Sequence, residues 1–297
     1  MNASVLEALK SNPALVQTLP AEVQLRVAEL LEELQERKKT DLARHDFMQF
    51  VHSVWPSFIN GAHHVKMARA FERVARGECK RLIINMPPRH TKSEFASYLL
   101  PAWFLGNFPH KKVIQTSHTA ELAVGFGRKV RNLVDSGTYK SIFSDVALQS
   151  DSKAAGRWNT SKGGDYFAIG VGGAVTGKGA DILIIDDPHS EQEAALAEVN
   201  PEIYDKTYEW YTSGPRQRLQ PGGAIIIVMT RWSKKDLTAQ VLKAAAQRSG
   251  DEWEVIEFPA ILPSGTPLWP EFWSLKELSV LRIELPNQKW MAQYMQN

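Results

Sequence analysis

Residues 81–93 read RLIINMPPRHTKS, an apolar run that meets a basic loop ending in a Lys-Ser pair. Residues 94–100, EFASYLL, then have the composition of a helix. Strand, loop and helix in this order are the context of a phosphate-binding loop, in which backbone N–H groups at the helix start face an anion. Lys92 would reach the β- and γ-phosphates of a nucleotide, and the Ser93 hydroxyl would hold Mg²⁺. The stretch therefore predicts a P-loop, and we call residues 86–93 the basic loop.

The basic loop departs from the usual phosphate-loop motif at two positions. That motif has glycines where this sequence has Met86 and Thr91. Glycine is favoured there because the chain turns tightly and its backbone approaches the phosphate closely. By itself, a Lys-Ser pair after a strand is more simply explained as an ordinary strand-to-helix loop with a solvated lysine. The interpretation therefore depends on the rest of the chain.

The composition is that of a globular protein without a strong polyanion signature. The chain has 297 residues, of which 43% are hydrophobic and 23% charged, which suits one large or two ordinary domains. Lys and Arg number 35 against 33 acidic residues, so nucleic-acid binding is neither demanded nor excluded. A single cysteine, Cys79, rules out an internal disulfide and fits a reducing compartment. Glu7 and Lys10 interrupt the N-terminus, which does not resemble a secretory signal, and no apolar run is long enough to span a bilayer. We expect a cytoplasmic protein.

A second motif follows at residues 182–188, ILIIDDP. An apolar strand that ends in adjacent acids is what a Walker B element needs, because the acids then lie at the carboxyl end of a buried strand. Asp186 would orient the Mg²⁺ shell, and Asp187 would polarise the attacking water. Adjacent buried carboxylates repel each other, so we expect a cation nearby. In isolation a surface turn before Pro188 is an adequate alternative; combined with the basic loop upstream, the motif favours an ATPase site.

The remaining segments fit an α/β pattern of alternating strands and helices. Further strands are expected at 112–117, 224–229 and 253–258, with a hairpin formed by 157–160 and 166–169. Helices are expected to open at Pro20 and end near 37–39, and to cover 62–76 and 119–134. Residues 221–223 should form a turn, 259–270 a linker or irregular arm, and Ser274 with Glu277 a capping box. Thr230, at the tip of the strand 224–229, is placed to sense a γ-phosphate.

Two surfaces near these motifs have both ordinary and functional interpretations. In the helix 119–134, Leu122, Phe126, Val130, Leu133 and Val134 share one face, and Arg128 and Arg131 project from the other side. Such arginines are ordinarily a solvated face, but in an oligomeric ATPase one of them could reach a neighbour's γ-phosphate. The aromatic segment 47–58 could stack on an adenine base, although core packing is the preferred interpretation.

Residues 87–93 (PPRHTKS), 182–188 (ILIIDDP) and 229–232 (MTRW) together resemble the ATPase domain of bacteriophage large terminase subunits, in motif order and spacing over residues 47–297. The resemblance implies an α/β P-loop NTPase of the ASCE type. Its mainly parallel central sheet would be flanked by helices, with a β-hairpin addition and, here, an N-terminal helical segment. It also implies a motor that uses ATP and Mg²⁺ to move double-stranded DNA into a procapsid. The implied partners are the DNA, a portal protein, a small terminase subunit and further copies in a ring, commonly a pentamer, with no membrane.

The same resemblance implies roles for individual residues. Those expected to bind ATP are Pro88, Arg89, His90, Thr91, Lys92 and Ser93, and those expected at the metal are Ser93 and Asp186. Asp187 stands where the family usually has a glutamate as catalytic base, and because aspartate is shorter, Glu191 remains an alternative. Thr230 and Arg231 resemble the coupling motif. Arg128 or Arg131 resembles the trans-acting arginine finger.

The expected domain organisation follows from these motifs. Residues 1–44 form an N-terminal helical segment, 45–258 the ATPase domain, and 259–297 a C-terminal linker and helical extension. The extension leads towards the RNase H-like nuclease domain of the family, which has no counterpart here, so nuclease activity is not expected. One alternative is a helicase-like or other DNA-dependent P-loop ATPase, which would need a second RecA-like lobe. The other is a nucleotide-binding protein with a decayed site, suggested by the two missing glycines.

Overall fold

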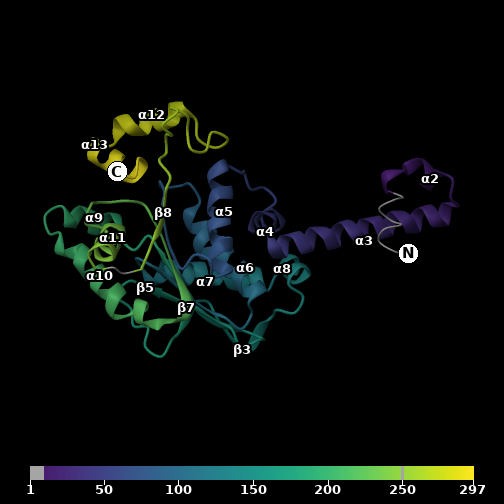
Figure 1. Ribbon diagram of the computed structural model, residues 1–297, viewed down its shortest axis with the longest axis horizontal. Coiled ribbons are helices and arrows are strands. Elements are labelled where there is room, and N and C mark those ends of the chain that lie inside the picture. The colour runs from purple at the N-terminus through teal and green to yellow at the C-terminus, as the bar shows by residue number, and fades with distance from the viewer. Residues whose placement is uncertain (1–9, 249–250) are drawn as a thin grey trace.

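The computed structural model describes residues 10–248 and 251–297, whose strands form one eight-stranded sheet (Figure 1). The strands are β1 (Arg81–Asn85), β2 (Lys112–Ser117), β3 (Leu148–Ala154), β4 (Arg157–Thr160), β5 (Asp165–Gly170), β6 (Ala180–Asp186), β7 (Leu219–Met229) and β8 (Glu254–Glu257). Their order across the sheet is β3-β4-β5-β2-β6-β7-β1-β8. Every pairing from β5 to β8 is parallel, and β4 pairs antiparallel with both β3 and β5. The predicted mainly parallel sheet with a hairpin addition is confirmed.

The central strands are buried on both faces, which explains their continuous apolar sequences. Side chains alternate between the two faces of a strand. Along β1, Leu82 and Ile84 therefore join one hydrophobic core, whereas Ile83 joins the core on the opposite face. Strand β7 lies between β1 and β6 and pairs with both. The strand that leads into the basic loop and the strand that ends in the two acids are thus separated by one strand.

Helices cover both faces of the sheet (Figure 1). The larger core is built with α4 (Phe47–Val54), α5 (Ala62–Ala75), η1 (Glu94–Leu99), α6 (Leu100–Asn107), α7 (Ala120–Val134) and α8 (Gly137–Ile142). The other face is covered by α10 (Glu202–Ser213) and α11 (Leu237–Arg248), with α9 (Glu191–Ala197) and η2 (Pro215–Arg218) beside α10 in the chain. The helices predicted at 62–76 and 119–134 are confirmed. One residue of the predicted apolar face is wrong: Leu122 is 39% exposed, because it lies in the first turn of α7 beyond the edge of the core.

The N-terminal helices project from the body of the molecule (Figure 1). They are α2 (Pro13–Gln17) and α3 (Ala21–His45). The prediction that this helix ends near 37–39 is wrong, because tertiary contacts carry it further: Ala43 is fully buried and its carbonyl oxygen accepts a hydrogen bond from Trp103 Nε1. Residues 1–9 of the expected segment 1–44, including Glu7, lie outside the described residues.

Three local features differ from the sequence-based expectations. Strand β3, which extends the hairpin to the sheet edge, was not predicted because its sequence LQSDSKA is polar and mostly exposed. Residues 221–223 do not form a separate turn. They lie within β7, where the pairing with β6 shifts between Ala180 and Ile182 and Gly222 adopts a φ of 80°. The helix after the basic loop begins as the π-helix η1 and continues through Pro101 as α6.

The C-terminal arm, residues 259–297, folds back over the basic loop. It contains α12 (Leu275–Glu284), α13 (Asn287–Lys289) and η3 (Trp290–Tyr294), and the predicted capping box of Ser274 with Glu277 is confirmed. Its first part is ordered by contacts, as in the bridge between Ile261 and Pro267 and the burial of Trp269, which is 3% exposed. No helix in the described ranges is long and apolar enough to cross a membrane.

Candidate active site

The carboxyl ends of β1, β6 and β7 lie at one edge of the sheet because the three strands run parallel. The basic loop follows β1, Asp186 and Asp187 end and follow β6, and Thr230 follows β7. Ligands of open α/β sheets bind at this edge. Residues separated by more than a hundred positions in the chain therefore meet in one site.

Two residues of the basic loop adopt left-handed backbone conformations. Arg89 has a φ of 61° and Thr91 a φ of 67°. Such conformations favour glycine and cost other residues about 1–3 kcal/mol unless neighbouring contacts hold them. For Thr91 these contacts are visible: its hydroxyl donates to the carbonyl oxygen of His90 at 2.6 Å and lies 2.7 Å from Nε2 of the buried His64. The loop thus keeps a glycine-like turn at Thr91 without the glycine.

Lys92 and Asp187 form a buried ion pair across the site. Lys92 is 6% exposed, and its Nζ lies 2.8 Å from Asp187 Oδ2. The other carboxylate oxygen, Oδ1, accepts a hydrogen bond from the Thr230 backbone N–H at 2.8 Å, and the Asp187 carbonyl oxygen lies 3.2 Å from His118 Nδ1. Asp187 itself adopts a φ of 41°, so these contacts hold a strained residue in place.

Asp186 is held by two serine hydroxyls one helical turn apart. Ser93 Oγ donates to Asp186 Oδ1 and Ser97 Oγ donates to Asp186 Oδ2, both at 2.8 Å. Behind them, Gln115 Nε2 donates to Ser97 Oγ at 3.3 Å and to Ser117 Oγ at 3.0 Å. Because an amide NH₂ can only donate, the Ser97 hydroxyl proton is directed towards Asp186. The chain Gln115–Ser97–Asp186 is completely buried and orients the carboxylate.

The electrostatics of Asp186 follow from its burial. Desolvation raises the pKa of its carboxyl group above the usual range, and the negative charge of Asp187 raises it further. Lys92 and the hydroxyls of Ser97 and Ser93 oppose this shift. A divalent cation would oppose it in the same way. The donors at hand are carboxylate and hydroxyl oxygens, which suit a hard cation such as Mg²⁺ that takes its other ligands from phosphate and water.

The two residues of the predicted coupling motif have different surroundings. Thr230 connects two loops, since its backbone N–H bonds Asp187 and its hydroxyl donates to the carbonyl oxygen of Met86 at 3.3 Å. Arg231 points to buried Asp236, with Nε 2.9 Å from Oδ2, and lies 3.7 Å from Glu257. Asp236 also accepts hydrogen bonds from the backbone N–H groups of Trp232 and Ser233, so it fixes the loop that follows Thr230.

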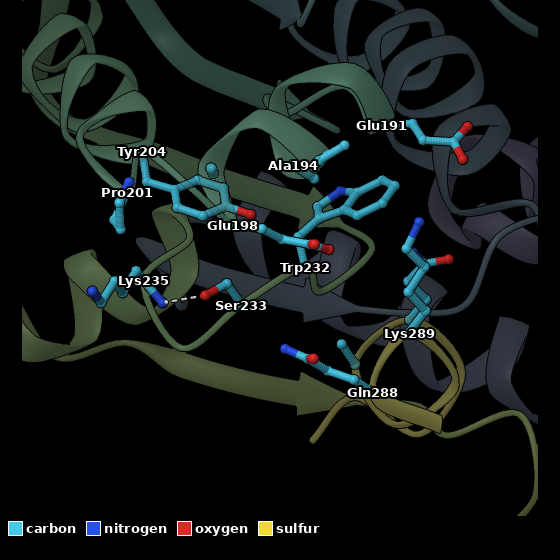
Figure 2. A pocket seen from close by; sticks show the side chains of 14 residues that line it. Glu191, Ala194, Glu198, Pro201, Tyr204, Trp232, Ser233, Lys235, Gln288 and Lys289 are labelled. Carbon is cyan, nitrogen blue, oxygen red and sulfur yellow. Dashed lines mark hydrogen bonds between the residues drawn. The ribbon is translucent and has the colours of Figure 1, made fainter. Parts of the chain in front are cut away.

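Glu191 and the two candidate arginine fingers are not brought into this cluster. Glu191 is exposed at the first turn of α9 and lines a separate cavity with Trp232 and Lys289, shown in Figure 2. Arg131 donates to the Lys153 carbonyl oxygen at 2.8 Å and also bonds Asn132. Arg128 is exposed and has no hydrogen-bond or ion-pair partner within the described part of the chain.

Several site residues were not found from the sequence. Ser97 and Gln115 carry no motif, and only the fold brings them to Asp186. Trp269 and Phe272 of the C-terminal arm line the same cavity as Lys92, together with Trp55. A signal existed for Trp55, since it lies in the aromatic segment considered for base stacking. No comparable signal marked the arm.

Comparison with solved structures supports this interpretation of the fold. No protein-family model matches the chain, and no curated protein matches it in sequence. The HK97 bacteriophage large terminase is similar with a TM-score of 0.50 and 12% identity, over 80% of this chain and 50% of that chain. A mutant ATPase domain of the Thermus phage P74-26 large terminase gives 0.48 and 15%, over 83% and 96%. The large terminase of a thermophilic bacteriophage, in complex with ADP, gives 0.46 and 11%, over 76% and 52%.

The chain spans about half the length of the HK97 terminase. At 12% identity this likeness concerns the fold, and the resemblance noted from the sequence motifs is confirmed at that level. Over four fifths of its length, the chain has the P-loop NTPase fold of a phage large terminase.

Proposed function

We propose that the protein is the ATP-hydrolysing motor domain of a phage large terminase. The observation that carries the proposal is the meeting of the basic loop with the acid pair: Lys92 contacts Asp187 and Ser93 contacts Asp186, each at 2.8 Å. Lysine and serine facing two carboxylates at the carboxyl edge of a parallel sheet are the parts that Walker A and Walker B elements supply for phosphoryl transfer. A decayed site would have no reason to keep all four.

The arrangement suggests a division of labour in hydrolysis. Lys92 leaves Asp187 and binds the β- and γ-phosphates, and the backbone N–H groups at the start of η1 face the same anion. Mg²⁺, when bound by Ser93 and oriented by Asp186, neutralises charge on the phosphate oxygens. Asp187 Oδ2, released from Lys92, accepts a proton from water as the water oxygen attacks the γ-phosphorus and the bond to the β-phosphate oxygen breaks.

Thr230 is well situated to report the state of the nucleotide. It is bonded to Asp187 on one side and to the base of the basic loop, at Met86, on the other. A shift of Asp187 on hydrolysis therefore changes the position of Thr230, and with it the loop that Asp236 fixes at the start of α11. This chain of contacts is the proposed coupling path, in which Arg231 anchors the loop.

The assembly and setting are part of the same proposal. We infer that the domain acts in the cytoplasm of a bacterial host, on double-stranded DNA, in a homo-oligomeric ring on the procapsid with a portal protein and a small terminase subunit. Within the chain, residues 1–44 would be the N-terminal segment, 45–258 the ATPase domain, and 259–297 the extension. DNA contacts would be made to the phosphate backbone and would weaken as salt rises.

The test is steady-state ATP hydrolysis with Mg²⁺, with and without double-stranded DNA, for the wild type and Lys92→Ala. We expect turnover that rises with protein concentration and with DNA and that is lost in the variant. Lys92→Arg controls for charge without the ammonium geometry. Binding of ATP without any turnover, at every protein and DNA concentration, would support the decayed-site alternative instead.

A further inference from the structure

A cavity of about 500 Å³ opens beside the basic loop, a size typical of small-molecule sites. At one end it is lined by Arg89, Lys92 and Ser93. At the other end its walls come from two segments that lie far apart in the chain: the connection between α4 and α5, and the C-terminal arm. The cavity is therefore cationic where it meets the basic loop and bounded by other chemistry beyond it.

The outer end of the cavity is apolar. Trp55, Phe58 and Ile59 line it from the α4–α5 connection, and Trp269 and Phe272 line it from the arm. Phe272 is 51% exposed and Ile59 44% exposed, although both lie next to a charged loop. Among the described residues that line this end, Ser57 is the one with a polar side chain. Large exposed apolar side chains beside a polar site commonly mark a ligand surface.

Phe272 is held in position by the arm beneath it. Its ring stacks on Trp269, with centroids 4.4 Å apart and planes at 19°. Trp269 is buried against the rings of His63 and His64, at centroid distances of 5.6 and 4.8 Å. An exposed aromatic ring supported from below in this way is a rigid surface that a planar ring can cover at little entropic cost.

We propose that this outer end takes the base of the nucleotide, that Phe272 of the C-terminal arm supplies a stacking face for it, and that the site discriminates weakly between bases. The proposal rests on the proposed function, since it assumes that the basic loop binds the triphosphate. Stacking recognises the face that every base has, whereas strong discrimination needs buried hydrogen-bonding groups aimed at the base edges. The outer end supplies rings and aliphatic side chains, and so favours the first kind of recognition.

The experiment measures displacement of a fluorescent ribose-labelled ADP by unlabelled ADP, GDP and inorganic tripolyphosphate, for the wild type, Phe272→Ala, Phe272→Trp and Ile283→Ala. Ile283 lies on the same arm, is 85% exposed and does not line the cavity, so it is the matched control. We expect Phe272→Ala to weaken ADP and GDP roughly tenfold each and to leave tripolyphosphate within about twofold. Phe272→Trp should retain affinity, and wild-type ADP and GDP should differ by less than about fivefold.

Failure of this inference is distinguishable from failure of the proposed function. If the wild type binds neither the labelled ADP nor tripolyphosphate, the proposed function is wrong and the base subsite falls with it. If the wild type binds nucleotide but Phe272→Ala leaves ADP unchanged, or weakens tripolyphosphate equally, the stacking role is overturned while the ATPase proposal stands. An ADP preference over GDP above about a hundredfold would overturn weak base discrimination alone.

Discussion

Lys92 Nζ lies 2.8 Å from Asp187 Oδ2, so the cation offered to phosphate and the carboxylate offered to water neutralise each other until a nucleotide separates them. Asp187→Asn removes the competing charge but keeps an oxygen able to accept the Thr230 N–H. We therefore expect this variant to bind ADP at least as tightly as the wild type, while ATP turnover falls by about 100-fold or more because the base is lost.

Glu191→Gln is the matched control for that prediction. Glu191 lines the other cavity (Figure 2) and is exposed, so turnover should stay within about twofold of the wild type. Single-turnover hydrolysis, measured with the protein in excess over ATP, separates the chemical step from product release. Wild-type turnover in Asp187→Asn combined with loss in Glu191→Gln would assign the base to Glu191.

Ser97 should determine how well the site holds its metal. It donates to Asp186 Oδ2 from a completely buried position, and Gln115 directs its proton. A hydrogen bond to a charged group contributes about 1.5–3 kcal/mol, so Ser97→Ala should raise the Mg²⁺ concentration at half-maximal stimulation of ADP binding by roughly tenfold or more. ADP binding measured in EDTA should not change. Ser141→Ala removes an exposed serine hydroxyl on α8 and should leave both values unaltered. An unchanged Mg²⁺ requirement in Ser97→Ala would contradict a positioning role.

Much of this arrangement was accessible from the sequence because it depends on short-range patterns. Apolar runs gave the strands β1, β2, β6 and β7, and the residues at their carboxyl ends gave the candidates that meet at the sheet edge. What the sequence did not reveal depends on contacts between distant segments. Thr91 tolerates a left-handed backbone because His64 lies beside it, twenty-seven positions earlier in the chain. Ser97 and Gln115 are ordinary polar residues until the π-helix η1 and strand β2 bring them together.

The C-terminal arm is the clearest case of such a missed contact. Its prolines and glycine indicated a linker, since local composition carries no information about the surface on which a segment packs. In the structure Trp269 fills a space that exists only because residue 61 is a glycine: a Cβ there would lie 2.8 Å from Trp269 Cδ1. The arm therefore belongs to the nucleotide site, and Gly61 provides a way to test this.

Gly61→Ala should loosen the arm. Its backbone φ of −127° suits alanine, so any effect comes from the collision with Trp269 and His63. We expect a loss of about 1–3 kcal/mol in the free energy of unfolding, together with weaker ADP binding because Phe272 moves with Trp269. Urea denaturation and the fluorescence-displacement assay measure the two effects. Gly125→Ala is the control: it lies inside α7 with nothing within 4 Å of the new Cβ, and should be neutral or stabilising. Equal stability of Gly61→Ala and the wild type would show that the arm is not packed as described.

The histidines under the basic loop should make stability depend on pH. Burial lowers the pKa of His63 and of His90 to about 4 and that of His64 to about 2. In the unfolded chain all three titrate near pH 6.5, so below this pH the unfolded state binds more protons than the folded one. The contribution is complete above pH 6.5 and is lost as the pH falls towards 4, by up to about 1.4 kcal/mol per pH unit for each histidine.

Urea denaturation at pH 7.5, 6.5 and 5.5 measures this slope. His63→Phe should reduce it by one histidine's share while preserving stability at pH 7.5, because neither ring nitrogen of His63 makes a hydrogen bond of normal geometry within the described part of the chain. His45→Phe replaces an exposed histidine at the end of α3 and should leave the slope as it is. A slope that is the same in His63→Phe and the wild type would mean that this histidine is charged in the folded state.

Arg128, rather than Arg131, is expected to act across a subunit boundary. Arg131 is occupied by the Lys153 carbonyl oxygen, whereas Arg128 is exposed and without a hydrogen-bond or ion-pair partner among the residues described. Arg128→Ala should lower concentration-dependent ATP turnover at least tenfold without changing ADP affinity, because a trans-acting arginine stabilises charge that develops during phosphoryl transfer. Mixing is the decisive measurement: Lys92→Ala cannot bind nucleotide but still carries Arg128, so adding it to Arg128→Ala should restore turnover that neither has alone. Arg131→Ala, as the comparison, should reduce stability and retain turnover. If the mixture stays inactive while each protein is folded and assembles, the arginine of α7 does not complete a neighbour's site.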